Sequence, residues 1–408
     1  MNRPYAKLTI TKKGERAARS GHPWVYGEEV THVEGTYQTG DIVDVYSDKD
    51  RYLGTGFAND ISKIRVRIVS RNANDRFDEA FWQRRVKYAL DYRKTVMGDK
   101  DFACCRLIFG DADDMPGLTV DRYNDVLVAQ TLCYGMDQVK PVIFKALVDE
   151  LAAMGVTIRG IYERNDVKVR ELDGMEEYKG WYQADFLPQP GSVLTTIDEN
   201  GILYDVDVEN GQKTGFFLDQ KYNRLAVAKI AAGKHVLDCF THTGAFALNA
   251  AKGGAASVTA VDISQEAVDM TNENIRRNGL EDIVTAKQAN VFDLLTNLAD
   301  HKCHDYDFII LDPPAFTKSG HTVHNAIRGY KEINLKAMKL LPRGGYLATC
   351  SCSHFMRDDL FRRMLHDAAK DAGVRLRQIE ERQQSPDHPI LWNVPETNYL
   401  KFYLFQVV

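Results

Sequence analysis

The sequence predicts an α/β protein that carries a mostly parallel sheet in its C-terminal half, with two smaller domains before it. The chain has 408 residues, and at about 150 residues per domain this length suits two or three domains. From about residue 190, apolar strands alternate with amphipathic helices, which is the pattern of a parallel sheet with crossover helices. Before about residue 70, short strands are separated by glycines, which is typical of a small β-barrel.

Composition excludes several classes of protein. The chain is 44% hydrophobic and 27% charged, as expected of a globular protein and not of a disordered or fibrous one. No apolar run reaches the roughly 18 residues of a membrane helix, and the basic N-terminus lacks the apolar segment of a secretion signal. The seven cysteines show no metal-ligand spacing, and their odd number favours free thiols in a reducing compartment. We therefore expect a cytoplasmic protein with no membrane partner and no bound metal.

The N-terminal module is basic although the chain has a net charge of −5. The strand expected over 61–71 alternates apolar and basic residues in its middle, so one of its faces carries Lys63, Arg65 and Arg67. Other basic and aromatic residues precede it, namely Lys12, Lys13, Arg16, Arg19, His22, Trp24 and Tyr26. These residues predict a surface that contacts phosphates and stacks on bases, and a merely solvated strand face explains them equally well.

The middle of the chain mixes helices and strands. Apolar spacing predicts helices over 74–97 and about 137–154, and strands over 119–122, 126–132 and 156–165. The segment RLIFGDADDMPGLTVDRY at 106–123 contains a loop rich in Asp, Gly and Pro. It is expected either near the mouth of an active site or in the packing of domains. The segment LPQPG at 187–191 predicts a linker.

The C-terminal half is expected to hold a sheet whose last strand is antiparallel. Strands are predicted at 234–240, 257–264, 283–290, 306–312 and 344–352, each followed by a helix, and two further strands at 374–382 and 398–408 close the chain. The last of these has no helix after it, so we expect it to return by a hairpin.

Aspartates end three of the predicted strands, where ligands bind in parallel sheets. They are Asp238, Asp262 and Asp312. One such aspartate is explained by helix capping, but three together favour a ligand site. Asp262 lies 18 residues after Gly244, which suits a carboxylate that holds both ribose hydroxyls. The first turn lacks the GxGxxG that cradles a pyrophosphate, which favours S-adenosylmethionine, whose sulfonium and amino-acid tail suit Asp238, over NAD.

The turn Asp312-Pro313-Pro314-Ala315-Phe316 is the most specific short motif. Two prolines fix φ and remove two N–H donors, so the turn is rigid. A polar residue, a rigid turn and an aromatic ring together can hold a planar base by its edge and its face. The alternative is a structural turn after a buried strand.

The sequence resembles the class I S-adenosylmethionine-dependent RNA methyltransferases, and more narrowly the bacterial large-subunit ribosomal RNA cytosine-C5 methyltransferases. The resemblance covers nearly the whole chain and includes HPWVY at 22–26, the 106–123 segment, GQKTGFFLDQKYNR at 211–224, LDCFTHTGAFAL at 237–248, VDIS at 261–264, LDPPAF at 311–316 and SCS at 351–353. It implies a PUA-like RNA-binding domain over 1–72, an EEHEH-type α+β domain over 73–188 and a Rossmann-like methyltransferase domain over 189–408.

The resemblance also implies the site residues. S-adenosylmethionine would be bound by Gln212, Lys213, Thr214, Phe216, Asp219, Asp238, Phe240, Thr243, Gly244, Asp262, Ser264, Asn290, Val291 and Asp312. Asn290 stands where the family usually has an acid, and its amide oxygen would accept from the adenine amino group. RNA would be bound by Lys63, Arg65, Arg67, Trp24, Pro313 and Phe316. The implied partner is large-subunit ribosomal RNA, and a homodimer is left open.

Cytosine C5 is a poor nucleophile, so its methylation needs a thiolate that adds to C6 and a carboxyl at N3. Cys352 and Asp312 are the candidates. Cys350 shares a strand face with Cys352 but lies deeper, and the resemblance also selects Cys352. The rival hypotheses are an amino-group RNA methyltransferase that needs no cysteine, a non-catalytic RNA-binding or ribosome-assembly module, and an NAD oxidoreductase.

Overall fold

The computed structural model describes residues 3–188, 190–301, 303–317 and 319–408, so residue 189 of the predicted linker lies outside the described part. The chain splits into two compact units. Unit 1 comprises Met1–Ile197, Asp205–Leu218 and Pro386–Thr397, and unit 2 comprises Asp198–Tyr204, Asp219–Ser385 and Asn398–Val408. Within the described ranges, no helix has both the length and the apolar character needed to cross a membrane.

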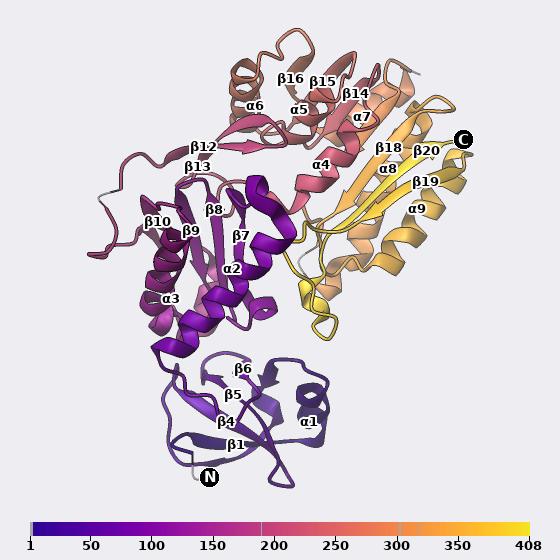
Figure 1. The fold of residues 1–408 in the computed structure, drawn as a ribbon. Helices are drawn as coiled ribbons and strands as arrows, with labels where there is room; N and C mark the ends of the chain where they lie inside the picture. The colour runs from indigo at the N-terminus through magenta and orange to yellow at the C-terminus, as the bar shows by residue number, and fades with distance from the viewer. Residues whose placement is uncertain (1–2, 189, 302, 318) are drawn as a thin grey trace. The chain divides into compact units, whose positions relative to one another are not determined.

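Unit 1 begins with a small β-rich domain (Figure 1). Its strands are β1 (Ala6–Ile10), β2 (Trp24–Tyr26), β3 (Val30–Glu34), β4 (Ile42–Ser47), β5 (Tyr52–Ala58) and β6 (Ile64–Ser70), in the sheet order β2-β6-β5-β4-β1-β3. Their buried residues form one apolar cluster, which includes Leu8, Val45 and Val66. The predicted β-rich module is thus confirmed.

The apolar and polar alternation of LTITKKG at 8–14 predicts a short strand there, and this predicted strand is too long. It ends at Ile10, and helix α1 (Lys12–Arg19) begins directly after it. Thr11 is the N-cap of this helix, and its hydroxyl accepts a hydrogen bond from the Gly14 N–H at 3.2 Å. A threonine at this position favours a helix start, because its side chain satisfies an N–H that the first turn leaves without a partner.

The second part of unit 1 is a sheet in the order β11-β10-β9-β8-β7, with two helices packed together. These elements are α2 (Glu79–Asp101), β7 (Cys104–Phe109), β8 (Leu118–Tyr123), β9 (Val126–Thr131), α3 (Tyr134–Ala153), β10 (Gly160–Asn165) and β11 (Tyr178–Trp181). The predicted strands and helices are all present. Helix α2 starts at residue 79 and not at 74, because Asp78 caps it by accepting from the Phe81 N–H at 3.0 Å.

The 106–123 segment is a packing element of unit 1. The Arg93 side chain is fully buried and binds both carboxylate oxygens of Asp113, with Nη2–Oδ2 at 2.8 Å. Arg106 binds Asp121 in the same two-pronged way, at 2.7 and 2.8 Å. The Arg93 guanidinium also donates to the Asp387 carbonyl at 2.9 Å, which joins the late segment 386–397 to this unit. Asp113 of the Asp-rich loop therefore neutralises the buried Arg93, and Asp121 of β8 neutralises the partly buried Arg106.

Unit 2 contains the predicted parallel sheet, in the order β16-β15-β14-β17-β18-β20-β19. Its strands are β14 (His235–Cys239), β15 (Ser257–Asp262), β16 (Val284–Gln288), β17 (Phe308–Leu311), β18 (Tyr346–Ser351), β19 (Leu376–Arg382) and β20 (Lys401–Val407). Strands β14 to β18 are parallel, and β20 is antiparallel to both of its neighbours. The antiparallel direction of the last strand is confirmed. Its insertion between β18 and β19 is a tertiary feature that the sequence did not predict.

Helices cover both faces of the unit 2 sheet (Figure 1). They are α4 (Lys221–Ala228), α5 (Ala245–Lys252), α6 (Gln265–Arg277), α7 (Val291–Asp300), α8 (Val323–Leu340) and α9 (Asp358–Ala372). On one face Tyr403 joins the α8 and α9 cluster, with its ring 6.0 Å from that of Phe361. On the other face Phe402 stacks on Phe246 of α5, with ring centroids 6.5 Å apart. The carboxyl ends of the parallel strands therefore meet at one edge between two helical layers.

Shorter elements complete the fold. Strands β12 (Leu194–Glu199) and β13 (Ile202–Asp207) pair with each other. Single 3₁₀ turns are η1 (Gly27–Glu29), η2 (Gly110–Asp113), η3 (Lys168–Asp173), η4 (Leu218–Gln220), η5 (Gly320–Thr322) and η6 (Pro395–Thr397).

We predict that Arg93→Met destabilises unit 1 by about 3–5 kcal/mol, because it leaves the Asp113 carboxylate buried without its partner. The matched control is Arg84→Met, since the half-exposed Arg84 lies 3.6 Å from Asp75 and should contribute less than about 1 kcal/mol. Urea unfolding followed by tryptophan fluorescence measures this, because all four tryptophans belong to unit 1. Equal midpoints for the two variants would contradict the prediction.

Candidate functional site

Asp238 ends β14 and is completely buried. Its Oδ2 accepts hydrogen bonds from the Thr241 hydroxyl at 2.6 Å and from the Ala247 N–H at 3.0 Å. Its Oδ1 is buried and has no hydrogen-bond partner among the described residues. Burial raises the pKa of this carboxyl to about 7, and the nearby Asp312 contributes to the rise. A buried acceptor without a donor is rare in folded proteins, so this oxygen points to a ligand that donates or carries positive charge.

The turn after β14 has an unusual backbone. Phe240 and His242 have φ values of 64° and 54°, in the left-handed region that residues with a Cβ seldom adopt. Such backbone strain concentrates at functional sites. Gly244 has φ 79°, and a Cβ there would lie 2.7 Å from the Thr271 side chain and 2.8 Å from Leu248. Gly244 is therefore required by the packing of α5 and α6, whatever its distance from a ligand.

Asp262 ends β15 and organises the adjoining turn. One of its oxygens accepts from the His242 N–H at 2.9 Å, and the other accepts from the Ser264 N–H at 3.0 Å. A carboxylate has about four acceptor positions, so each oxygen can take one more donor. The predicted role of Asp262 in binding two ribose hydroxyls is compatible with these contacts.

Two of the predicted cofactor residues cap helices with their side chains. The Ser264 hydroxyl accepts from the Ala267 N–H at 3.3 Å and caps α6. The Asn290 amide oxygen accepts from the Phe292 N–H at 2.9 Å and caps α7. That oxygen is the atom expected to meet the adenine amino group, and it has a second lone pair to accept that hydrogen bond. The next residue, Val291, is buried beneath the cap, and Thr243 is buried in the first turn.

Asp312 follows β17 and is held in place from another segment. Its Oδ1 accepts from the Gln220 Nε2 at 2.9 Å, and its carboxyl also shares a hydrogen bond with the Cys350 thiol. Burial raises the pKa of Asp312 to about 6; Arg224 opposes the rise and Asp219 adds to it. Gln220 was not predicted as a site residue, although the 211–224 segment that contains it was.

The two cysteines at the end of β18 lie in different surroundings. Cys350 is fully buried, and burial together with Asp312 raises the pKa of its thiol well above the ordinary value. Cys352 is partly exposed, and its sulfur lies 4.0 Å from the Pro313 carbonyl oxygen. The next residue, Ser353, donates to the Thr317 carbonyl at 3.0 Å. The structure thus joins the turn after β18 to the Asp-Pro-Pro turn after β17.

Phe316 packs inside the protein. Its ring centroid lies 4.6 Å from that of Tyr330, 5.8 Å from that of Phe292 and 6.5 Å from that of Phe240. Pro313 is also buried. These contacts favour the structural explanation of this part of the turn, and stacking of Phe316 on a base stays a prediction.

The predicted cofactor residues before Asp219 belong to unit 1. There the Thr214 hydroxyl donates to Asp121 at 2.6 Å, and the Tyr123 hydroxyl donates to the Phe216 carbonyl at 3.0 Å. Gln212 and Lys213 belong to the same segment, and Lys213 has a left-handed φ of 54°. Asp219 belongs to unit 2, where it accepts from the Tyr399 hydroxyl at 2.7 Å. The prediction that these unit 1 residues contact the cofactor stays a prediction.

The predicted RNA-binding strand is β6. Lys63, just before it, is exposed, but Arg65 forms an ion pair with Asp60. Arg67 lies 3.5 Å from Asp173 and 5.8 Å from the centre of the Trp24 ring. The Trp24 indole in turn donates to Asp111 at 3.1 Å. The alternation of basic and apolar residues is confirmed, but two of the three cations have carboxylate partners.

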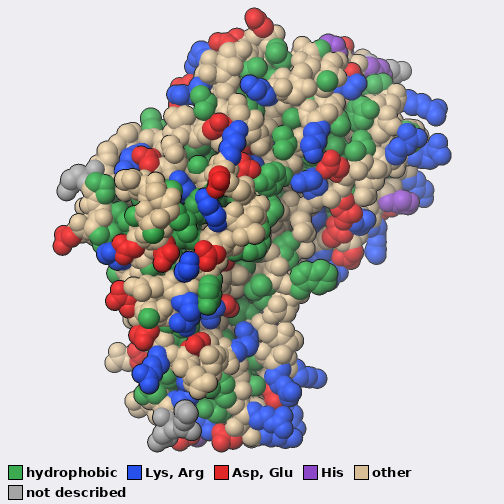
Figure 2. Space-filling view, viewed as in Figure 1, with side chains coloured by type: hydrophobic (Ala, Val, Ile, Leu, Met, Phe, Trp, Pro, Cys, Tyr) green, Lys and Arg blue, Asp and Glu red, His purple; other side chains and the backbone are tan. Residues whose placement is uncertain are grey.

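A second basic surface lies on α1 and the turn between β4 and β5. It surrounds a hollow of about 610 Å³ lined by Lys12, Glu15, Arg16, Arg19, Ser20, Asp48, Lys49 and Arg51. Figure 2 shows Lys and Arg side chains gathered over this part of the molecule. Among the described residues, Lys12, Arg16, Lys49 and Arg51 have no ion-pair partner. We name these four the α1 cluster.

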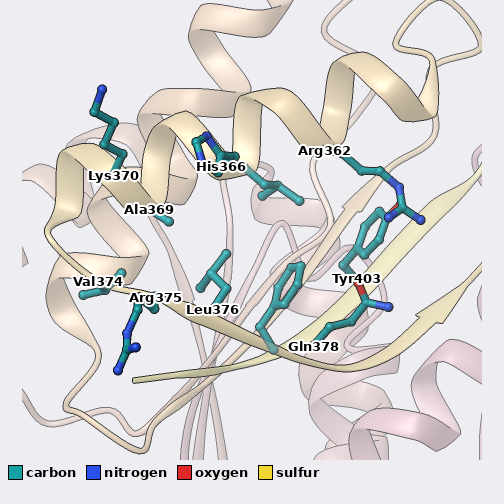
Figure 3. A pocket seen from close by; sticks show the side chains of 11 residues that line it. Arg362, His366, Ala369, Lys370, Val374, Arg375, Leu376, Gln378 and Tyr403 are labelled. Carbon is teal, nitrogen blue, oxygen red and sulfur yellow. The ribbon is translucent and has the colours of Figure 1, made fainter.

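A hollow of about 440 Å³ lies between α9 and strands β19 and β20 (Figure 3). Its apolar lining includes Leu365, Leu376 and Phe405, and Arg362 and Lys370 stand at its border. It extends to the end of α9 and the start of β19, away from the carboxyl ends of the parallel strands. It is therefore separate from the site of the aspartates.

Two family models and several relatives match the chain. A family model described as PUA-like domain matches residues 8–71, and one described as S-adenosylmethionine-dependent methyltransferase matches residues 144–406. The chain is 40% identical over 396 residues to ribosomal RNA large subunit methyltransferase I of Shewanella amazonensis, which covers 97% of this chain and 98% of the relative. It is 36% identical over 406 residues to the Klebsiella pneumoniae protein of that name, which covers 99% of each chain.

Two solved structures share the fold. A protein from Streptococcus mutans described as an S-adenosylmethionine-dependent methyltransferase has a TM-score of 0.80 at 24% identity, and covers 98% of this chain and 99% of its own. A methyltransferase complexed with S-adenosylhomocysteine has a TM-score of 0.82 at 23% identity, with the same coverage.

S-adenosylmethionine fits the residues present. It carries a sulfonium and an ammonium, and the unpartnered oxygen of Asp238 offers a negative charge in a buried place. It also carries two ribose hydroxyls, for which Asp262 has acceptor positions left. Asp238 and Asp262 are therefore the residues that we expect to hold the cofactor.

We predict that the affinity for S-adenosylmethionine rises by roughly fivefold to tenfold between pH 6 and pH 7.5. The Asp238 carboxyl has a pKa of about 7 and is neutral below it, so a cationic ligand gains its charged partner only as pH rises through 7. Calorimetry should show this slope in wild type and in Asp262→Asn, and a nearly flat profile in Asp238→Asn. An unchanged slope in Asp238→Asn would assign the titration to another group.

Proposed function

The chain belongs to the S-adenosylmethionine-dependent methyltransferases that carry an N-terminal PUA-like domain, and from this premise we propose that it methylates C5 of cytosine in large-subunit ribosomal RNA. The names of the relatives support large-subunit ribosomal RNA as the substrate. The choice of carbon rests on one observation, which is the position of the Cys352 sulfur 4.0 Å from the Pro313 carbonyl, beside the Asp312 turn. A thiol next to the turn that carries an acid is what C5 methylation needs and what amino-group methylation does not.

In the proposed reaction, the Cys352 thiolate adds to C6 of cytosine and N3 takes a proton from the Asp312 carboxyl. C5 thereby becomes a nucleophilic carbon that can take up a methyl group. S-adenosylmethionine, when bound, supplies this methyl group in electrophilic form on its sulfonium. A base then removes the C5 proton, the C6–S bond breaks, and N3 returns its proton to the Asp312 carboxylate, which restores the thiolate, the acid and the aromatic ring.

The surroundings of Asp312 suit the role of an acid. With a pKa of about 6, its carboxyl keeps a proton in a fraction of molecules near neutral pH, whereas an ordinary aspartate keeps almost none. Gln220 fixes one oxygen by donating to it at 2.9 Å. The raised pKa of Cys350 makes that thiol a poor source of thiolate, which leaves Cys352 as the nucleophile.

The location and the assembly state are also part of the proposal. We place the protein in the cytoplasm, where bacterial ribosomal RNA is found. The homodimer is left open, and light scattering of the purified protein decides it.

We predict that ribosomal RNA transcribed with 5-fluorocytidine forms a denaturation-stable adduct with wild type and none with Cys352→Ala. Fluorine at C5 cannot leave as a proton, so the thiolate stays bonded to C6. The matched control is Cys350→Ala, two residues earlier on the same strand, which should still form the adduct. Gel electrophoresis and mass spectrometry of the methylated product measure both.

The outcomes separate the hypotheses. An adduct that persists in Cys352→Ala would remove Cys352 from the mechanism. Methylation that survives both substitutions would make the amino-group methyltransferase the leading hypothesis. A protein that fails to bind S-adenosylmethionine would support the non-catalytic RNA-binding module.

We predict that RNA affinity depends on the α1 cluster more than on the β6 strand. Each lost phosphate contact flattens the slope of log K against log salt by about 0.7 for single strands. Replacing Lys12, Arg16, Lys49 and Arg51 by Ser should flatten it by up to about 3. Replacing Lys63, Arg65 and Arg67 should flatten it by about 1 or less, because Asp60 and Asp173 already partner two of them. Fluorescence anisotropy over a salt series checks this, and the reverse order would contradict it.

A further inference from the structure

A buried lysine lies beside the turn that carries Cys352. Lys401 is the first residue of β20 and pairs in register with Ser351, the last residue of β18. The residue is 7% exposed. Its ammonium donates to the Ser353 carbonyl at 2.7 Å and to the Tyr399 carbonyl at 2.8 Å. Because Ser353 directly follows Cys352, the ammonium is anchored to the turn of the predicted nucleophile.

This lysine lacks the carboxylate that normally accompanies a buried ammonium. Within the described part of the chain, no Asp or Glu forms an ion pair with it. Burial lowers the pKa of Lys401 to about 8, and the neighbouring Cys352, followed by Asp358, opposes this decrease. Asp358 is already paired with Arg362 at 2.7 Å. At neutral pH most of the Lys401 side chains therefore carry a positive charge that an anion at Cys352 would neutralise.

Other titratable groups also lie near Cys352. Cys350 and Tyr330 both interact with it, and burial raises the pKa of each, so both are neutral near pH 7. The Asp312 carboxyl precedes Pro313, which contacts the Cys352 sulfur, and its negative charge opposes a thiolate where it is ionised. Lys401 supplies a positive charge that offsets this repulsion. A nearby cation stabilises a thiolate relative to its thiol, and this is how proteins activate cysteine nucleophiles.

We infer that Lys401 is a positioning residue whose buried positive charge keeps the sulfur of Cys352 in its reactive thiolate form. The inference deepens the proposed function and rests on its assignment of Cys352 as the nucleophile. The alternative is that Lys401 only ties two carbonyls together. Two substitutions separate the effect of the charge from that of the hydrogen bonds. Lys401→Gln keeps two N–H donors but removes the charge, whereas Lys401→Arg keeps the charge.

The test measures the pH dependence of Cys352 alkylation by iodoacetamide in the full-length protein without RNA, from pH 6 to pH 10, by peptide mass spectrometry. Cys303 is an internal control, because it is also partly exposed while the other five cysteines are buried. In wild type, Cys352 should titrate below the ordinary thiol value of about 8.5. In Lys401→Gln, its alkylation at pH 7 should fall about tenfold, and Lys401→Arg should retain it within about threefold. The Cys303 rate should not change.

Two results would overturn the inference. One is a Cys352 profile that is the same in Lys401→Gln and wild type. The other, which needs no variant to fold, is a wild-type Cys352 that titrates at or above the ordinary value. A Lys401-dependent profile without any 5-fluorocytidine adduct would refute the proposed function but support the effect of the charge on the thiol. An adduct with a Lys401-independent profile would refute the inference alone.

Discussion

Carboxylates that end parallel strands are forced to share one edge of the sheet, and the candidate site depends on this constraint. Asp238 lies near the end of β14 and Asp312 follows β17, and these two strands are direct neighbours. Burial raises the pKa of both carboxyls, with Asp312 adding to the rise at Asp238 and Asp219 adding to the rise at Asp312. Thr241 stabilises the Asp238 carboxylate, and Arg224 and Gln220 stabilise that of Asp312, but only in part. A cationic ligand would complete the electrostatic balance.

The same edge of the sheet brings the proposed acid and the proposed nucleophile to one turn. The Asp-Pro-Pro turn presents the Asp312 carboxyl, and the Pro313 carbonyl lies against the Cys352 sulfur. Lys401 enters from β20, the strand inserted next to β18, and binds the residue after Cys352. Acid, thiol and cation therefore come from three strands that are adjacent in the sheet but distant in sequence.

Several residues in the most recognisable segments support the local fold. Gly244 has a left-handed φ and a position where a Cβ would collide with Thr271. Asn290 caps a helix, and Phe316 packs in an aromatic cluster with Tyr330. In unit 1, Arg93 and Asp113 serve burial and packing. A residue in a recognisable segment thus often holds the backbone that places the reactive groups.

The sequence by itself determined the fold class, the order of the C-terminal strands and helices, and the three aspartates at strand ends. These features depend on hydrophobic periodicity and on the geometry of parallel sheets, both of which are local patterns. Only the tertiary structure decided which charges are free, because a partner can come from any distance along the chain. Arg67 meets Asp173, Gln220 meets Asp312, and Lys401 reaches the turn after Cys352. The difference between a buried Cys350 and an accessible Cys352 is likewise tertiary, since both occupy the same face in the strand pattern and only packing sets their exposure.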